Sequence, residues 1–378
     1  MSLVQPPATY QALRRALADL PDPGRLPWLV DFLAEAASAA AAAGKRGVPN
    51  AWRLAQSLAT SHPDLLRNAC EALLTPGAGP ARHFAIDTLA RLHNRQEDFA
   101  ALRALLERFA EAPPRQAKVA RRKLLLRSLL LDQALDQASR QALWAQHAAV
   151  LSPLGRASGA VQLALADGIR PDPAALLAEV EAAIASGPAL PAPLARLAAA
   201  RDVALVGNGS GLARAGAAAL IEAHDAVVRF NFPHLAGFEA DVGRRTDLVL
   251  FAEAKRWNLE ALRQRDKSYD GLPAFGTRIT WPRDPAVEAE ADQVPRPLAE
   301  AVAALGDEHP TTGFFGILMV AVLLRRKVTL FGFDFFAPGL PGHYYGDATA
   351  AMTHELAYER WCVGHLLPLL APELRRHG

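Results

Sequence analysis

The sequence contains little cysteine: Cys70 and Cys362 are the two cysteines among 378 residues, and they lie far apart. A chain of this length can bury enough apolar surface to fold without disulfides, so two distant thiols predict a reducing compartment. Metal-binding patterns are also lacking, since the sequence has no Asp-x-Asp motif and neither cysteine has a second cysteine or a nearby histidine pair at zinc spacing. The acidic cluster Glu288–Asp292 is interpreted as a solvated loop rather than a cation site. We expect no metal and no other cofactor.

The sequence also lacks an excess of either charge and a long apolar run. Its 41 basic and 39 acidic side chains leave a net charge of +2, which excludes a global field directed at nucleic acid or an anionic membrane. The longest apolar run, Gly313–Leu324, is far shorter than the ~20 residues of a membrane-spanning helix, and the N-terminus shows no signal-peptide pattern. We therefore expect a cytoplasmic protein with no transmembrane segment and no nucleic-acid partner. Peripheral attachment to the inner membrane stays open.

Residues 1–190 are rich in alanine, leucine, arginine and glutamine, and strand signals are almost absent there. Phe99, Leu102, Leu106 and Phe109 recur at helical spacing. We predict an all-α domain that is either an irregular bundle or a short solenoid, because no repeat of fixed period is evident. This domain could bind a protein partner. The proline-containing stretch 191–201 is the expected linker.

Residues 202–378 form the second predicted domain, because short β-branched runs alternate there with helical patterns. We expect an α/β domain with a Rossmann-like, mainly parallel sheet. The expected strands are residues 203–207, 226–231, 247–252, 277–281 and 328–333. Ligands of such sheets bind at the carboxyl ends of the strands. That rule directs attention to Gly207–Gly211, Asn231, Glu253 and Gly332–Asp334.

The turn "GNGSG" carries glycines at 207, 209 and 211, whereas a dinucleotide-binding fingerprint requires its third glycine at the position of Leu212. We expect instead a single nucleotide or a phosphate, bound by exposed N–H groups of a turn that opens a helix. Asn208 and Asn231 would lie at the same edge of the sheet and could bind a ribose or a base. Both asparagines could equally serve only to shape the backbone.

Two later segments add candidates for binding and proton transfer. Thr311 and Thr312 precede an apolar helix and predict an N-cap, whose N–H groups and hydroxyls could also hold a phosphate or a pyrimidine. His343 and His354 follow the last expected strand. Imidazole titrates nearest neutrality, so these histidines are the best candidates for proton transfer. A histidine in a loop is nevertheless most often a surface residue.

Four segments, in order, resemble the motifs of glycosyltransferase family 29, the animal-type sialyltransferases. Residues 203–247 are similar to the large sialylmotif, with its Val-Gly-Asn turn and Arg-x-Asn strand end, and residues 309–334 to the small one. "HYY" at 343–345 resembles the third motif, and His354 with Glu359 resembles the His-x4-Glu motif. The resemblance spans about 202–365. Two family features, a cysteine pair in the large and small motifs and a membrane anchor, are missing, which suggests a bacterial-like soluble member.

The resemblance implies an inverting, metal-independent transferase with a GT-A-like sialyltransferase fold. Such an enzyme would move a sialic-acid-like sugar from a CMP-sugar donor such as CMP-Neu5Ac to a hydroxyl of a glycan or lipid-linked glycan. The CMP-sugar is a substrate, so no cofactor is implied. His343 would steady the leaving phosphate, and His354 would be the general base. The implied donor-binding residues are Gly207, Asn208, Gly209, Asn231, Thr311, Thr312, Gly313, Gly332, Phe333, His343 and Tyr344.

Two other functions stay open from the sequence. A transferase of cell-surface polysaccharide synthesis that uses CMP-Kdo would need the same features, because CMP-Kdo shares the nucleotide and the anomeric carboxylate. A non-catalytic nucleotide-sugar-binding or scaffold protein could also keep the motifs as parts of its fold. An oxidoreductase is disfavoured by the incomplete glycine fingerprint.

Overall fold

The structure, a computed structural model, describes most of the chain in two compact units. The described residues are 15–42, 49–75, 79–109, 115–185, 187–252, 260–261, 263–264, 271–276, 294–307, 309–335, 343 and 354–377. The units divide between Val150 and Leu151.

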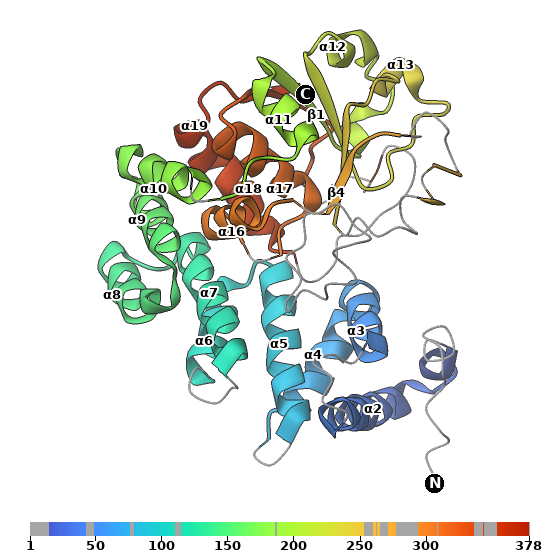
Figure 1. The fold of residues 1–378 in the computed structure, drawn as a ribbon. Coiled ribbons are helices and arrows are strands. Elements are labelled where there is room, and N and C mark those ends of the chain that lie inside the picture. Colours follow the sequence, from blue (N-terminus) through green and yellow to red (C-terminus); the bar gives the residue numbers. More distant parts are fainter. Residues whose placement is uncertain are drawn as a thin grey trace. The chain divides into compact units, whose positions relative to one another are not determined.

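The first unit consists of helices throughout its described residues (Figure 1). The helices are α2 (Asp22–Ala42), α3 (Pro49–Ser61), α4 (Pro63–Ala72), α5 (Gly79–Arg95), α6 (Phe99–Arg108), α7 (Arg115–Leu131), α8 (Gln137–His147) and the 3₁₀ turn η1 (Ala148–Val150). The apolar spacing that predicted a helix falls on α6, where Leu102 and Leu106 are buried. The side chain of Asp98 caps this helix by accepting a hydrogen bond from Ala101 N at 3.1 Å.

The second unit begins with three helices that the sequence placed in the helical domain and the linker. They are α9 (Pro153–Ala166), α10 (Ala174–Ala185) and α11 (Ala192–Ala199). Both α9 and α10 pack on α16 (Arg296–Leu305), a helix of the second unit. The division at Val150 therefore differs from the boundary expected at residue 190. That boundary rested on the absence of strand signals, which does not reveal the partner on which a helix packs.

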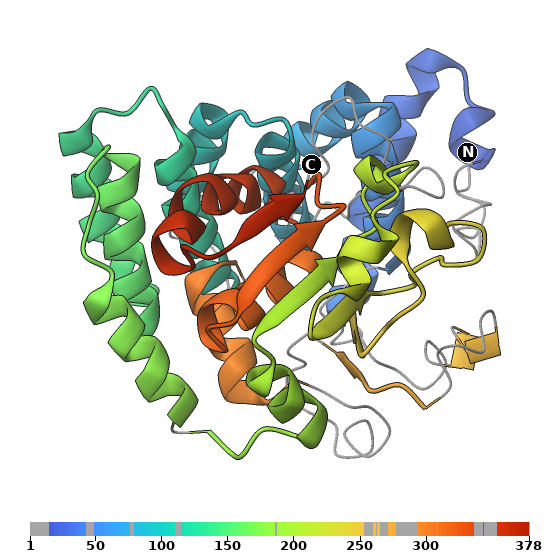
Figure 2. The ribbon, with the colours of Figure 1, turned by 90° about the horizontal axis from the view of Figure 1, so that it is seen from above.

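A six-stranded sheet organises the second unit, with the strand order β4-β3-β2-β1-β5-β6. All of its neighbouring strands pair in parallel, and Figure 2 shows them running in one direction. The strands are β1 (Asp202–Val206), β2 (Ala226–Phe230), β3 (Leu248–Phe251), β4 (Ala274–Gly276), β5 (Lys327–Phe331) and β6 (Arg375–His377). The mainly parallel sheet predicted from the sequence is confirmed.

Four of the expected strands correspond to β1, β2, β3 and β5. The expected strand at 277–281 lies outside the described residues, and β4 ends just before it at Gly276. Strand β6 was not expected, because its sequence Arg-Arg-His has no β-branched or apolar residue. Its pairing with β5, such as Leu330 with Arg376, is what makes this segment a strand.

Helices cover both faces of the central strands. The further helices of this unit are η2 (Ser210–Leu212), α12 (Ala218–Glu222), α13 (Glu239–Val242), α17 (Thr312–Ile317), the π-helical η4 (Leu318–Leu323), α18 (Leu356–Trp361), the π-helical η5 (Cys362–Leu366) and α19 (Leu367–Leu370). On one face, Val206 and Val227 pack with Ile221 of α12 and Val242 of α13. On the other face, α17 packs on β3 and η4 packs on β5. The strands consequently carry near-continuous apolar runs, as expected for a parallel sheet buried on both sides.

A buried arginine on β2 holds the segment that leads into β3. Arg229 is 0% exposed, and its guanidinium donates to the carbonyl oxygens of Val242 (2.6 Å) and Arg245 (3.0 Å). It also donates to the hydroxyl of Thr246 at 2.9 Å. A buried charged group costs much free energy unless its hydrogen bonds are made. These acceptors therefore explain how the guanidinium is tolerated inside the domain.

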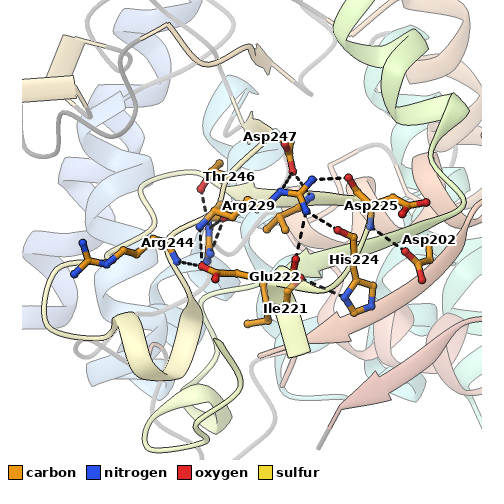
Figure 3. A network of polar contacts seen from close by, with 11 residues as sticks. Asp202, Ile221, Glu222, His224, Asp225, Arg229, Arg244, Thr246 and Asp247 are labelled. Carbon is orange, nitrogen blue, oxygen red and sulfur yellow. Dashed lines mark hydrogen bonds and ion pairs between the residues drawn. The ribbon is translucent and has the colours of Figure 1, made fainter. Parts of the chain in front are cut away.

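The same segment is fastened to the end of α12, as Figure 3 shows. Glu222 accepts hydrogen bonds from the backbone N–H groups of Arg244 (2.6 Å) and Arg245 (3.1 Å), which lower the pKa of the Glu222 carboxyl. In return, the guanidinium of Arg245 donates to the carbonyl oxygens of His224 and Asp225. The polar contacts thus join three consecutive pieces of the fold: the end of α12, strand β2 and the entry to β3.

Two features bear on the expectations drawn from composition. Cys70 and Cys362 are both buried, and neither forms a disulfide. Within the described residues, no helix combines the length and the apolar character that a membrane span requires.

We expect the Arg229→Met variant to be markedly less stable. The substitution leaves buried acceptors of the 242–246 segment without their donor, and such groups cost about 1–3 kcal/mol each. Urea titration should show a free energy of unfolding lower by about 3 kcal/mol or more. Arg201→Met is the matched control, because Arg201 pairs with Asp225 while its side chain is 90% exposed. Equal unfolding midpoints for the two variants would contradict the role given to Arg229.

Candidate functional site

The candidate site lies at the carboxyl edge of the three strands β2, β1 and β5. Val206, the last residue of β1, pairs with Arg229 of β2 and with Phe331, the last residue of β5. The ends of the three strands therefore meet at one edge. The residues that follow them are Gly207–Gly211, Asn231 and Gly332–Asp334, which the sequence had placed together. Glu253, which was expected near this edge, lies outside the described residues.

The glycine turn after β1 packs against the loop after β5, backbone to backbone. Gly207 N–H donates to the Phe331 carbonyl oxygen at 2.8 Å, and Gly209 N–H donates to that of Gly332 at 2.8 Å. A Cβ atom on either Gly207 or Gly209 would lie 2.5 Å from the Gly332 oxygen, which is closer than such atoms approach. Gly332 itself has a φ of 66°, a left-handed conformation that glycine adopts without strain. These glycines serve the close approach of two loops.

The anion site expected at this turn is not formed in the way the sequence suggested. The turn leads into the short 3₁₀ turn η2, and α12 begins only at Ala218. The N–H groups of Gly207 and Gly209 are used by the β5 loop, and Ser210 N–H donates to the carboxylate of Asp334 at 3.1 Å. The expectation of exposed N–H groups at a helix start was wrong for these three residues, because the neighbouring loop supplies its own acceptors.

The two asparagines occupy the same edge but have different surroundings. Asn231 has a φ of 56°, and its Oδ1 accepts from Ala252 N at 3.0 Å and from the Thr312 hydroxyl at 3.4 Å. Asn208 Nδ2 donates to the Phe230 carbonyl oxygen at 3.1 Å, whereas its buried Oδ1 has no hydrogen-bond partner among the described residues. Such an oxygen is costly unless a donor reaches it. Asn231 Oδ1 is therefore used within the protein, whereas no described residue satisfies the Asn208 oxygen.

Thr311 is the N-cap of α17, as predicted, and its hydroxyl is fully used within the protein. Thr311 Oγ1 accepts from Phe314 N at 3.2 Å and donates to Glu359 Oε2 at 2.7 Å. Thr311 N–H donates to Glu359 Oε1 at 2.6 Å. A hydroxyl has one hydrogen, so this residue has none left to donate to a phosphate. Sequence spacing gave no indication of the contact, because Glu359 lies far along the chain in α18.

Gly313, in the first turn of α17, lies against the ring of Phe333. A Cβ atom at Gly313 would lie 2.8 Å from Cε1 of that ring. Phe333 also contacts the rings of Phe230 (5.6 Å between centroids) and Phe335 (5.8 Å). Phe333 therefore ties the end of β2, the loop after β5 and the start of α17 into one apolar contact. Its role in the described structure is packing.

Glu359 is a buried acid that contacts Thr311, the N-cap of α17. Its side chain is 0% exposed. Burial raises the pKa of its carboxyl well above the usual range, and the nearby carboxylate of Asp307 adds to this shift, while the hydrogen bonds from Thr311 oppose it. Asp307 is also 0% exposed, and its Oδ1 accepts from His309 N at 2.6 Å. Two buried carboxyls thus lie close together beside the N-terminus of α17.

The two candidate histidines have different environments. His354 precedes Glu355, the N-cap of α18, and its Nδ1 lies 2.7 Å from the carbonyl oxygen of His309. A carbonyl only accepts, so Nδ1 carries the proton and the lone pair of the neutral ring is on Nε2. Burial lowers the pKa of His343, and the neighbouring Asp334 carboxylate opposes that shift. Tyr344 and the acidic cluster Glu288–Asp292 lie outside the described residues.

The described residues include no group of three or more His, Cys, Asp or Glu side chains placed to hold a metal ion. The site is thus defined by carboxamides, hydroxyls, buried acids and histidines. It lies at a sheet edge where the glycine turn and the start of α17 meet.

Residues 179–269 match the family Glycosyltransferase family 29 (sialyltransferase). The matched segment includes the glycine turn, Asn208 and Asn231, and it ends before Thr311 and both candidate histidines. Two curated relatives, each named type 2 lactosamine alpha-2,3-sialyltransferase, come from Mus musculus and Rattus norvegicus. Each is 29% identical over 194 residues, which cover 41% of this chain and 57% or 56% of the relative. The chain therefore spans little more than half the length of these sialyltransferases.

Two solved structures are also similar to this chain. One is a mammalian sialyltransferase in complex with Gal-beta-1-3GalNAc-ortho-nitrophenol, with 19% identity, a TM-score of 0.35, and coverage of 53% of this chain and 79% of that one. The other is a mammalian sialyltransferase with 21% identity, a TM-score of 0.34, and coverage of 53% and 78%. These scores are too low to establish a shared fold.

We expect Gly209→Ala to destabilise the protein while Gly211→Ala does not. A Cβ at Gly209 would lie 2.5 Å from the Gly332 oxygen and 2.8 Å from Asp334 Oδ2, whereas a Cβ at Gly211 would have no atom within 4 Å. Overpacking against backbone costs about 1–3 kcal/mol. Thermal unfolding followed by circular dichroism should therefore give a clearly lower Tm for Gly209→Ala alone. If both variants melted with the parent, the backbone contact would not be the constraint described.

Proposed function

We propose that this protein is an inverting, metal-independent glycosyltransferase that moves a sialic-acid-like sugar from a CMP-sugar donor to a glycan hydroxyl. The observation that carries the proposal is the match of residues 179–269 to the sialyltransferase family. The match covers the glycine turn, Asn208 and Asn231, which lie at the carboxyl edge of the sheet, where ligands of parallel α/β sheets bind.

Asn208 is the first residue assigned to the donor. Its buried Oδ1 is an acceptor without a partner among the described residues, and it suits a donor group of cytosine or ribose. A dinucleotide is disfavoured, because Leu212 stands at the third position of the glycine fingerprint and the nearby N–H groups of Gly207 and Gly209 are already used. Asn231, Thr312 and Gly313, at the same edge of the sheet, would complete the nucleotide site.

His343 is assigned to the phosphate of the leaving CMP. Departure of CMP from an anomeric carbon creates new charge on the phosphate, and a positioned donor stabilises it without a metal ion. Burial lowers the pKa of this imidazole. The phosphate would raise that pKa again, and the Asp334 carboxylate acts in the same direction. An N–H of His343 would therefore donate a stronger hydrogen bond to the phosphate as charge develops on the leaving group.

His354 is assigned as the general base. Its Nδ1 proton is held by the His309 carbonyl, so Nε2 can accept the proton of the acceptor hydroxyl. The acceptor oxygen then forms a bond to the anomeric carbon as the bond from that carbon to the CMP oxygen breaks. A covalent nucleophile would have to be an acid or another nucleophilic side chain that can reach the sugar. The buried acid Glu359 is already held by two contacts with Thr311, so we assign no covalent nucleophile. A single displacement of this kind inverts the anomeric configuration.

The donor sugar and the acceptor are tested by direct turnover. The protein is incubated with CMP-Neu5Ac or CMP-Kdo, with and without type 2 lactosamine, the sugar named in the curated relatives. We expect CMP release from CMP-Neu5Ac that the glycan increases and that excess EDTA leaves unchanged. Release from CMP-Kdo alone would favour the other donor, and no release from either would favour a non-catalytic binding protein. Loss in EDTA with rescue by manganese would overturn the metal-independent mechanism.

The roles of the two histidines predict different kinetic defects. His354→Ala should keep the rise in Tm that CMP causes, while turnover falls by about 10²–10⁴-fold, because a base acts on the acceptor and not on the bound nucleotide. His343→Ala should reduce turnover and also weaken the CMP-induced rise in Tm. His365→Ala, an exposed histidine of η5, is the control. Turnover within a few fold of the parent for all three variants would refute both assignments.

A further inference from the structure

The His309–Thr311 turn supplies a carbonyl oxygen that favours the form of the His354 ring with its proton on Nδ1. The His309 carbonyl oxygen accepts from His354 Nδ1 at 2.7 Å. If this carbonyl moved away, the two neutral forms of the imidazole ring would become closer in free energy. The basic nitrogen would then be Nδ1 in part of the molecules. The position of one backbone carbonyl is therefore coupled to the chemistry proposed for His354.

This turn is held on both sides by buried acids. On one side, His309 N–H donates to Asp307 Oδ1 at 2.6 Å. On the other side, Thr311 donates to Glu359 through its N–H at 2.6 Å and its hydroxyl at 2.7 Å. Pro310 lies between them, with its fixed φ, and it restricts the backbone of His309 as well. The carbonyl of His309 thus has little freedom to move while these hydrogen bonds persist.

The free energy of folding does not by itself explain why acidic side chains, Asp307 and Glu359, hold this turn. Asp307 and Glu359 are both 0% exposed, and a buried carboxylate costs free energy that a second acid nearby increases. A neutral acceptor could also cap Thr311. Both oxygens of the Glu359 side chain face Thr311, with Oε1 at 2.6 Å from the Thr311 nitrogen and Oε2 at 2.7 Å from Thr311 Oγ1, so Glu359 holds both polar groups of Thr311 at once. That bidentate geometry fixes the turn more closely than a single hydrogen bond would.

We propose that Glu359 is a positioning residue for His354: it clamps Thr311, and through the His309–Thr311 turn it keeps the proton of the imidazole on Nδ1 and the lone pair on Nε2. The inference rests on the proposed function for its kinetic consequence, since only there does His354 act as base. Glu359 need not touch the donor or the acceptor. Its effect on the His354 ring is transmitted through the backbone of residues 309–311.

Glu359→Leu tests this clamp with little change in side-chain size. Leucine has no hydrogen-bonding atom, so it can hold neither Thr311 N–H nor Thr311 Oγ1. We expect the ¹⁵N NMR signals of the His354 ring to change from a single Nδ1–H form to a mixture of both forms. We expect kcat to fall by about 10–100-fold, as when an orienting partner of a functional histidine is removed. The KM for the CMP-sugar and the CMP-induced rise in Tm should stay near the parent values.

Tyr358→Phe is the matched control on the same helix. It removes a buried hydrogen bond of 2.6 Å from Tyr358 to Gln162 that does not involve the turn. We expect it to lower Tm while the His354 ring keeps its single form and kcat is retained. If Glu359→Leu behaved in the same way, with one Nδ1–H form and the kcat of the parent, Glu359 would be structural only and the proposal would be overturned.

A second pair of variants, at Thr311, keeps the test decisive if Glu359→Leu does not fold. Thr311→Ser keeps the hydroxyl bonded to Glu359, and Thr311→Val removes it. We expect the single Nδ1–H form in the serine variant and a mixture in the valine variant; identical ring signals in the two would count against the clamp. Because the NMR measurement needs no turnover, a parent protein that releases no CMP would refute the proposed function without affecting this result.

Discussion

The candidate site depends on the direct contact of two loop backbones, in which the carbonyl oxygen of Gly332 accepts the N–H of Gly209 at 2.8 Å. This contact requires glycines, because a side chain on either partner of the turn would overlap the carbonyl. It brings the ends of β1 and β5 together and places Asp334 where it can bind Ser210 N–H. Phe333, in the same loop, packs over Gly313 at the start of α17. This backbone contact thus helps to set the relative positions of the turn Gly207–Gly211, the acid Asp334 and the helix α17.

Beside this contact, the site contains polar groups that do not serve stability in an obvious way. Asn208 has a buried oxygen without a partner among the described residues, and Glu359 and Asp307 are buried acids placed close together. Arg229 differs from them, since its many acceptors satisfy the guanidinium and hold the entry to β3. Groups that cost stability tend to gather at functional sites. The contrast separates the residues that hold the fold together from those for which we propose a role in binding or proton transfer.

The sequence predicted those parts of the structure that depend on local pattern. Short β-branched runs located β1, β2, β3 and β5, and the pair Thr311 and Thr312 predicted the N-cap of α17. Features that depend on partners distant in sequence could not be predicted. The sequence did not indicate that the loop after β5 would accept the hydrogen bonds of the N–H groups in the glycine turn. It also did not indicate that Thr311 would donate hydrogen bonds to Glu359. The unit boundary at Val150 was missed for the same reason, since it depends on where α9 and α10 pack.

Among the described strands, β6 forms one edge of the sheet and pairs with β5. Its two arginines, Arg375 and Arg376, are exposed, and His377 is partly exposed. A strand at a sheet edge presents hydrogen-bonding groups to which another chain can add, and positive side chains oppose such pairing because they would be crowded together and stripped of water. The sequence Arg-Arg-His made β6 unpredictable as a strand because these residues form strands weakly. The same charged residues therefore also disfavour self-association of the protein through this edge at high protein concentration.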